Sequence, residues 1–390
     1  MHCFILVNPG LQNVAQQELK ELVKSKATIS GQALEFTIPG KEELIRLCAR
    51  GQSFRRLLVF IDKFAALERL DADKVSFPWS DFFPLQFSFK IEVEGVPGQE
   101  NRFQIAGEVA GKLFSCFQKN KFTPTLNVKK PDYTLIVYFT GKEYWVGLDC
   151  CEEIDSRSYR VFPHQATFKG DLAYYFVRQS GFKPKEKLLL GFVRDGGLAI
   201  EAALYANKLP VRERAKMPLQ RFPSIAAEAA PQKLPPKQKM ILSKIISFDP
   251  NRQNIIAAQK NGKIAWLAGV VRAAGAGVGG VEVTGVEVGR AGVLDAVEFH
   301  RYALDELDTR FSPEEFDRII IHLTKKDEEK INEMFYQGNY VLKKGGHLFI
   351  IGRGGLELPV PENYLLAEMQ EIRRGDSEYK WWLLRKKAKG

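Results

Sequence analysis

Residues 187–206 hold the pattern that most constrains the fold of this chain. The apolar run Leu188–Leu190 is typical of a buried strand, Gly196 and Gly197 follow as a turn, and a helix carrying Glu201 comes next. A strand, a glycine turn and a helix N-terminus form the usual site for a nucleotide-type cofactor. Glycine lets the backbone approach the ligand, and the first N–H groups of a helix are unpaired. The pattern therefore predicts an α/β domain with a cofactor site at this turn.

Charge and cysteine content limit the partners of the chain. Its 57 basic and 47 acidic residues give a net charge of +10. This excess favours an anionic partner, most simply nucleic acid, although a solvated surface with a few basic loops is the alternative. No apolar run approaches the roughly 18 residues of a membrane span, so we expect no membrane partner. The five cysteines lack CxxC spacing, so we expect reduced thiols, a cytoplasmic protein and no bound metal.

The two halves of the chain differ in their order of elements. The first half reads as α+β, and repeated β–α units after residue 160 predict a parallel sheet with helices on both faces. The basic, proline-containing stretch 211–244 is expected to be a long mobile loop. Residues 269–293 are rich in Gly, Val and Ala, and either bulged strands or an irregular insertion would fit them. Expected strands are 4–7, 34–38, 56–61, 133–139, 143–148, 188–190, 245–248, 317–322, 347–351 and 381–384, and expected helices include 41–49, 102–115, 168–180, 252–266 and 331–342.

Several stretches together resemble the THUMP-containing RNA methyltransferases of archaea and bacteria. Lys130–Tyr133 and Trp145–Asp149 are similar to the end of a THUMP domain, and Arg157–Arg160 is similar to the Arg-x-Tyr-Arg signature that follows it. The resemblance implies a Rossmann-like methyltransferase sheet preceded by an α+β ferredoxin-like and THUMP region. It places the ferredoxin-like region at 1–65, the THUMP RNA-binding domain at 66–155 and the methyltransferase domain at 156–390.

The resemblance also implies a site for S-adenosyl-L-methionine (SAM). Ile200–Ala203 matches the family's Ile-Glu-Ala-Ala, and Asp195, Gly196, Gly197 and Glu201 are the implied cofactor residues of the turn. Arg194 stands where the family has its first glycine, and Leu190 and Gly191 stand where it has Asp-Pro.

Asp249 ends a later strand, where an acid can bind ribose hydroxyls, although Asp-Pro before a helix is also a common N-cap. Asp308 is a candidate acid near the adenine ring. Asp305 competes with it, and a capped loop is equally compatible with this segment.

The fourth motif would carry the chemistry. Relatives use Asn/Asp-Pro-Pro-Tyr/Phe to orient a target amine and stack on a flipped base. Here the aligned residues are His322-Leu323-Thr324-Lys325, without proline or an aromatic ring. His322 is the candidate catalytic residue, as an amine-orienting group or a base, and a structural histidine is the alternative.

The THUMP resemblance implies an RNA partner, expected to be tRNA, that is recognised by its shape. Candidate phosphate-binding residues are Lys121, Lys129, Lys130, Arg157 and Arg160. The sequence thus predicts an RNA-binding, SAM-dependent methyltransferase acting on a base amine, for example guanine N2, of tRNA or rRNA. The alternative is a non-catalytic RNA-binding paralogue that keeps the fold without SAM binding or methyl transfer.

Overall fold

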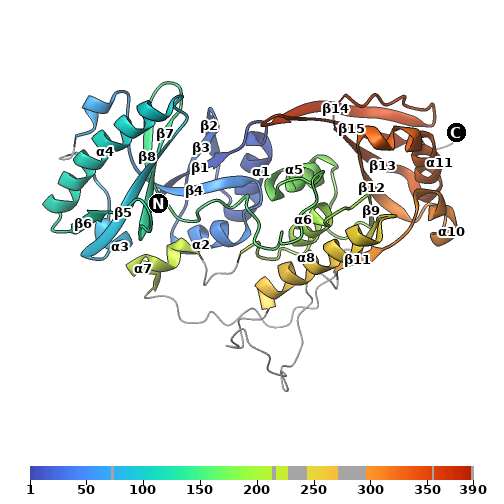
Figure 1. Cartoon of the computed structure of the whole chain (residues 1–390), viewed down its shortest axis with the longest axis horizontal. Coiled ribbons are helices and arrows are strands. Elements are labelled where there is room, and N and C mark those ends of the chain that lie inside the picture. The colour runs from blue at the N-terminus through green and yellow to red at the C-terminus, as the bar shows by residue number, and fades with distance from the viewer. Residues whose placement is uncertain (72–73, 213–216, 227–243, 271–295, 354, 388–390) are drawn as a thin grey trace, which may run out of the picture. The chain divides into compact units, whose positions relative to one another are not determined.

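A computed structural model describes residues 1–71, 74–212, 217–226, 244–270, 296–353 and 355–387 (Figure 1). The chain divides into two compact units. The first contains Met1–Ile154 and Arg212–Leu234, and the second contains Asp155–Val211 and Pro235–Gly390. The segment 269–293, for which the sequence left bulged strands and an irregular insertion both open, lies almost wholly outside the described residues.

The first unit is built on one eight-stranded sheet with the order β2-β3-β1-β4-β8-β7-β5-β6. Helices α1 and α2 pack together, α1 also contacts β2 and β3, and α4 lies along β5 and β6. One sheet spans both regions that the sequence separates at residue 65. The elements are β1 (His2–Val7), α1 (Gln12–Val23), β2 (Ala27–Ser30), β3 (Ala33–Thr37), α2 (Lys41–Arg50), β4 (Phe54–Phe64), η1 (Leu67–Arg69), α3 (Trp79–Phe82), β5 (Gln86–Glu94), α4 (Gln99–Lys119), β6 (Thr123–Leu126), β7 (Tyr133–Phe139) and β8 (Tyr144–Asp149).

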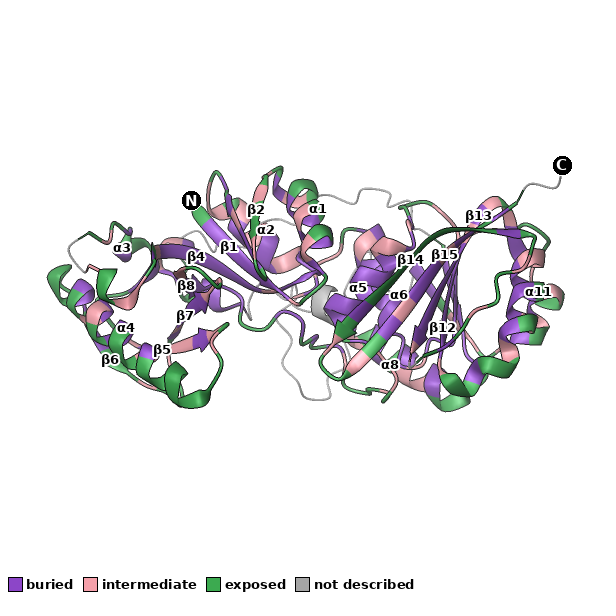
Figure 2. Ribbon diagram, turned by 90° about the horizontal axis from the view of Figure 1, so that it is seen from above, coloured by how far each residue is buried: buried purple, intermediate pink, exposed green. Residues whose placement is uncertain are grey.

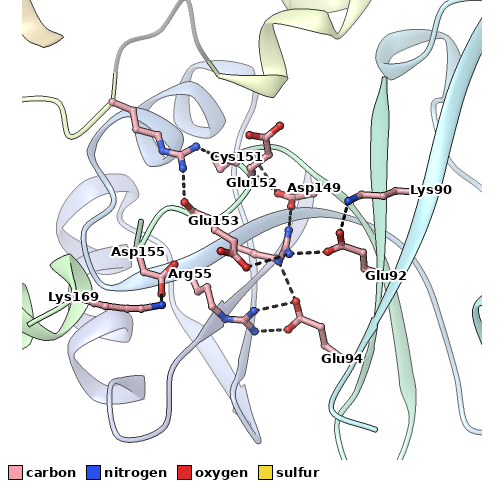
Figure 3. A network of polar contacts seen from close by, with 12 residues as sticks. Arg55, Lys90, Glu92, Glu94, Asp149, Cys151, Glu152, Glu153, Asp155 and Lys169 are labelled. Carbon is pink, nitrogen blue, oxygen red and sulfur yellow. Dashed lines mark hydrogen bonds and ion pairs between the residues drawn. The ribbon is translucent and has the colours of Figure 1, made fainter. Parts of the chain in front are cut away.

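Arg56 lies at the centre of a network of charges that crosses this sheet. Its guanidinium bonds Asp149 on β8 and pairs with Glu92 and Glu94 on β5, and Arg55 adds a second pair to Glu94 (Figure 3). Arg56 is only 7% exposed and Asp149 only 4% exposed, so each charge depends on the other for compensation. Burial raises the pKa of Asp149 above its usual value.

A later piece of the chain completes the first unit. Residues 217–226 form η3 (Pro218–Arg221) and α7 (Pro223–Ala226), and Phe222 is fully buried with its ring 5.3 Å from that of Phe82. Full burial of such a side chain stabilises a fold by about 1.5–3 kcal/mol. The prediction of a mobile loop is therefore wrong for 217–226, because apolar contacts hold this segment. Residues 213–216 and 227–243 lie outside the described part.

Two of the five cysteines are joined in a disulfide, contrary to the prediction from the sequence. Cys48 and Cys151 form a disulfide, with 5.7 Å between their Cα atoms, whereas Cys3, Cys116 and Cys150 are free and buried. The expectation of reduced thiols is therefore wrong for the bonded pair. Its members lie 103 positions apart, a separation that no local spacing pattern reveals.

The second unit is built on a seven-stranded sheet with the order β11-β10-β9-β12-β13-β15-β14. Neighbours from β11 to β13 run parallel, whereas β15 is antiparallel to both β13 and β14. The elements are α5 (Gly170–Gln179), β9 (Leu188–Gly191), α6 (Gly197–Ala206), β10 (Ile245–Phe248), α8 (Arg252–Val270), β11 (Val297–His300), η5 (Leu304–Glu306), α10 (Leu307–Arg310), β12 (Phe316–Leu323), η6 (Lys325–Lys330), α11 (Ile331–Val341), β13 (Leu342–Arg353), β14 (Tyr364–Arg374) and β15 (Ser377–Lys386).

Helices cover both faces of this sheet, and its central strands are buried (Figure 2). Leu189, Ile319 and Ile321 join Met334 and Phe335 of α11 in one core cluster. On the opposite face, helices α5 and α6 pack against each other, and the ring of Phe176 lies 6.4 Å from that of Phe349. The predicted parallel sheet is confirmed from β11 to β13, whereas the antiparallel β14 and β15 depart from the prediction. Among the described residues, no helix is long and apolar enough to cross a membrane.

Candidate cofactor site

The carboxyl ends of β9, β10 and β12 meet at one edge of the sheet. Gly191 at the end of β9 pairs with Phe248 of β10 on one side and with Ile321 of β12 on the other. In open α/β sheets, ligands bind outside the carboxyl ends of the parallel strands. The residues that follow these three strands are therefore the candidate site.

Gly196 makes the turn between β9 and α6 possible. Its φ of +81° lies in the left-handed region, and an added Cβ would come within 2.9 Å of the Ala258 side chain on α8. The glycine is needed both for the backbone conformation and for close packing of the turn against that helix. Gly197 then begins α6, and its N–H donates to Asp195 Oδ1 at 3.1 Å.

Asp195 holds a neighbouring loop against this turn. Its Oδ2 accepts bonds from Thr167 Oγ1 at 2.8 Å, from the His164 N–H at 3.3 Å and from Arg160 Nη2 at 3.4 Å. The side chain is fully buried. The prediction that Asp195 binds the cofactor is therefore corrected: its carboxylate is enclosed by protein donors. Asn261 on α8 also donates to the Asp195 carbonyl, at 3.0 Å.

Glu201 and Arg157 form a buried ion pair. Arg157 donates through Nε at 2.7 Å and through Nη2 at 3.2 Å, and the Tyr159 hydroxyl donates to the same carboxylate at 2.7 Å. Glu201 is fully buried and Arg157 only 5% exposed. Neither side chain offers surface to a ligand. The predicted roles of Glu201 in cofactor binding and of Arg157 in RNA binding are therefore corrected to a structural pair that holds α6.

Asp249 is the acid that remains at the edge. Its Oδ1 accepts bonds from the Asn251 N–H at 2.9 Å and from Asn254 Nδ2 at 3.0 Å, and its Oδ2 accepts one from the Arg194 N–H at 3.0 Å. The N-cap of α8 is Asn251, whose Oδ1 accepts the Gln253 N–H at 2.8 Å, so the N-cap interpretation of Asp249 is wrong. A carboxylate has about four lone-pair positions, so these three bonds leave one. Asp249 is only 2% exposed, so a ligand hydroxyl reaches this position only if the surrounding turn opens.

Arg194 links the three strand ends. It follows β9 with a left-handed φ of +52°, its N–H reaches Asp249 after β10, and its Nη2 lies 3.4 Å from Asp327 Oδ2 after β12. Asp327 also accepts bonds from Thr324 and from Lys330. The sequence marked Arg194 only as a departure from the family pattern. Its partner lies 133 positions away, so local spacing gave no signal for the pair.

His322 lies at the end of β12 and is almost fully buried, with 2% of its surface exposed. Its ring centre lies 4.4 Å from that of Phe168, and its Nε2 has no hydrogen-bond partner in the described structure. Burial, followed by the nearby Arg194 charge, lowers the pKa of His322 well below its usual value. The imidazole is therefore neutral at pH 7.

Asp308 lies apart from these contacts. It belongs to α10, and its backbone N–H donates to Gln337 Oε1 on α11 at 2.8 Å. Gln337 also donates to the carbonyl of Asp305, at 3.1 Å. The acid that caps this segment is Glu306, whose carboxylate accepts the Ala303 N–H at 2.6 Å. The contacts thus agree with the capped-loop alternative.

The candidate RNA-binding lysines fall in the first unit. Lys121, Lys129 and Lys130 are exposed, and no ion pair of theirs is found within the described ranges. The backbone N–H groups of Lys129 and Lys130 donate to Asn127, which fixes the loop between β6 and β7. Arg160 is in the second unit and bonds Thr167 at 2.9 Å. Among the described residues, no group of three or more His, Cys, Asp or Glu could hold a metal ion.

Comparisons with known proteins agree with this fold. The chain is 26% identical over 284 residues to the tRNA (guanine(6)-N2)-methyltransferase of Methanocaldococcus jannaschii, covering 68% of this chain and 73% of that protein. It is 22% identical over 206 residues to the ribosomal RNA large subunit methyltransferase K/L of Photobacterium profundum, covering 52% of this chain but only 29% of that protein.

Solved structures match the whole chain. TrmN from Thermus thermophilus superposes with a TM-score of 0.66 at 17% identity, covering 99% of both chains. SMU.472, solved in complex with SAH, gives 0.69 at 15% identity, covering 100% of this chain and 99% of that one. The predicted Rossmann-like methyltransferase fold is confirmed. Residues 157–289 match the family model described as UPF0020, RMKL-like, methyltransferase domain.

Proposed function

We propose that the chain is a SAM-dependent RNA methyltransferase that modifies a base amine, such as guanine N2, in tRNA or rRNA. The match of residues 157–289 to a methyltransferase family carries this proposal. Two relatives named for tRNA and rRNA methyl transfer support the substrate class. The alignment with the tRNA enzyme covers more of both proteins, which favours tRNA.

The strand ends fit the nucleoside part of SAM. Asp249 has acceptor capacity left for a ribose hydroxyl, and the left-handed Gly196 packs the turn against Ala258 of α8. When bound, SAM would supply an activated methyl group to a nucleophilic amine. The residues of this chain would hold the cofactor at the sheet edge.

His322 is the proposed group for the target amine. Because its imidazole is neutral at pH 7 and its Nε2 is unpartnered, this nitrogen can accept a hydrogen bond from the amine and orient it. The lowered pKa disfavours the protonated imidazole, so we assign His322 the orienting role rather than that of a base. His322 is nearly enclosed, so the proposal requires the adjoining segments to open around it when RNA binds.

The first unit is proposed to bind the RNA through a THUMP-type domain. Exposed Lys121, Lys129 and Lys130 supply positive charge next to an edge strand, and shape recognition needs phosphate contacts of this kind. We place the protein in the cytoplasm with its RNA. The Lys129→Ala/Lys130→Ala variant should bind tRNA more weakly. The slope of its log affinity against log salt concentration should fall by the equivalent of about two phosphate contacts. An unchanged slope would show that the RNA binds elsewhere on the protein.

Methyl transfer is tested with tritiated SAM and unmodified tRNA or rRNA transcripts, followed by nucleoside analysis of the product. We expect label in a methylated guanine, and we expect Asp249→Asn to weaken SAM binding without unfolding the chain. Glu298→Gln, a change at a half-exposed acid on the neighbouring strand β11, is the matched control. No SAM binding at millimolar concentration would refute the proposal.

A second candidate function is RNA binding without methyl transfer. The observation that favours it is the enclosure of Asp195 and Glu201, whose carboxylates are occupied by protein donors. This candidate predicts tRNA affinity with no heat of SAM binding. The same titration therefore decides between the two functions.

A further inference from the structure

Arg194 makes fewer contacts than its chemistry allows. A guanidinium has five N–H donors, and its strong bonds to carboxylates are short and often paired. Here a single contact joins Nη2 to Asp327 at 3.4 Å, and the buried Nε has no partner within the described structure. The side chain is 13% exposed, so a small ligand can reach it. Arg194 is therefore a cation with unused donors at the cofactor edge.

His322 supplies a second unpartnered nitrogen in the same region. It follows Ile321, which pairs with Gly191 on the strand that leads to Arg194. Phe168 packs on its ring, and the charge of Arg194 is close enough to affect its protonation. Arg194 and His322 thus lie at adjacent strand ends, and each has a nitrogen without a partner. The carboxylate of Asp327 lies nearby, bonded to Thr324 and Lys330.

We infer that Arg194 and Asp327 form a subsite for an amino-acid zwitterion, the methionine end of SAM. Arg194 would bind the α-carboxylate through two parallel bonds. The α-ammonium would then replace Arg194 Nη2 on Asp327 Oδ2, where the present contact is long at 3.4 Å, while Thr324 and Lys330 keep their bonds to Asp327. A lone phosphate is a poorer fit because Asp327 repels it, whereas a zwitterion matches both charges. This inference rests on the proposed function, since it specifies how that site would hold its cofactor.

The test compares two cofactors that differ only in the carboxylate. SAM and decarboxylated SAM are titrated by calorimetry into the full chain. We expect the wild type to bind SAM about 10-fold to 100-fold more tightly than decarboxylated SAM. This is the range of affinity that hydrogen bonds to a charged group contribute. Arg194→Ala should remove this preference while leaving the affinity for decarboxylated SAM nearly unchanged. Arg373→Ala, which breaks an exposed ion pair on β14, is the matched control and should keep the preference.

Two further variants separate binding from folding. Arg194→Gly keeps the turn because glycine adopts the left-handed backbone of this position without strain, whereas alanine strains it. Its preference for SAM over decarboxylated SAM should be lost, as in Arg194→Ala. Asp327→Asn should weaken both ligands, because both carry the amine, and leave their ratio unchanged.

The outcomes are distinct. Equal affinity of the wild type for the two ligands, or an unchanged ratio in both Arg194 variants, overturns the subsite but keeps the proposed cofactor. Tighter SAM binding in Arg194→Gly also overturns it, since Arg194 would then obstruct the site. No binding of either ligand to the wild type refutes the proposed function and the subsite together.

Discussion

The Glu201→Gln substitution tests whether the second unit depends on its buried ion pair. The change keeps the shape of the side chain and removes its charge. Arg157, whose side chain is 1% exposed, would then stay charged beside a neutral amide. The first turn of α5 packs closely against Arg157: a Cβ on Gly170 would lie 2.4 Å from the Nε atom of this arginine. The arginine therefore cannot move aside without disturbing that helix.

The expected cost follows from the geometry. Glu201 accepts two bonds from Arg157 and one from Tyr159, all buried. Removing one partner of a buried pair costs about 3–5 kcal/mol, because an uncompensated charge remains. A domain has a total stability of about 5–15 kcal/mol, so this loss is a large part of it. The double variant Arg157→Met/Glu201→Met should lose less than the two single changes added together.

The assay must report on each unit separately. Amide hydrogen exchange followed by mass spectrometry gives the opening free energy of peptides from α5 and α6, alongside peptides from the first unit. The control is Glu378→Gln, which loses an exposed pair with Arg373 and should change stability by about 0–1 kcal/mol. A cost below about 1 kcal/mol for Glu201→Gln would refute the reasoning.

Three further predictions concern stability. Arg56→Ala should destabilise the first unit by about 3–5 kcal/mol, measured by denaturant unfolding, because Asp149 loses its buried partner; a neutral effect would contradict the network. Gly196→Ala should lower the melting temperature more than Gly375→Ala, whose Cβ would meet open space at a similar positive φ; equal shifts would exclude a packing contribution. Burial, then the charges of Arg318 and Arg385, lower the pKa of His347 to about 4. The unfolded chain therefore binds more protons between pH 6.5 and 4, so stability falls as pH falls through this window, and His347→Gln should flatten the fall measured by urea unfolding.

Local patterns predicted most elements of the described residues but missed the strands β2, β5, β6, β11 and β14. The apolar run at Leu188–Leu190 and the alternation of strands and helices after residue 160 are set by neighbours in the chain, and the strands and helices formed close to their expected bounds. The expected strands 133–139 and 143–148 also formed, and they pair antiparallel because a glycine turn joins them.

Contacts between distant residues decided the rest. Arg157 looks like a basic residue available to RNA, but a carboxylate 44 positions later buries it. Cys48 pairs with a cysteine 103 positions away, and Phe222 is buried by rings of the first unit. Each of these outcomes depends on tertiary packing, which single-chain periodicity does not encode. The same holds for the bond between Arg194 and Asp327.

The path of the chain between the two units has a consequence for its synthesis. Residues 217–226, which bury Phe222 in the first unit, are translated after β9 and α6 of the second. Folding during synthesis usually proceeds unit by unit from the N-terminus. Here the first unit remains incomplete on the ribosome until part of the second has emerged. A fragment ending at Ile154 would lack this piece, so no single cut in the gene yields two complete halves.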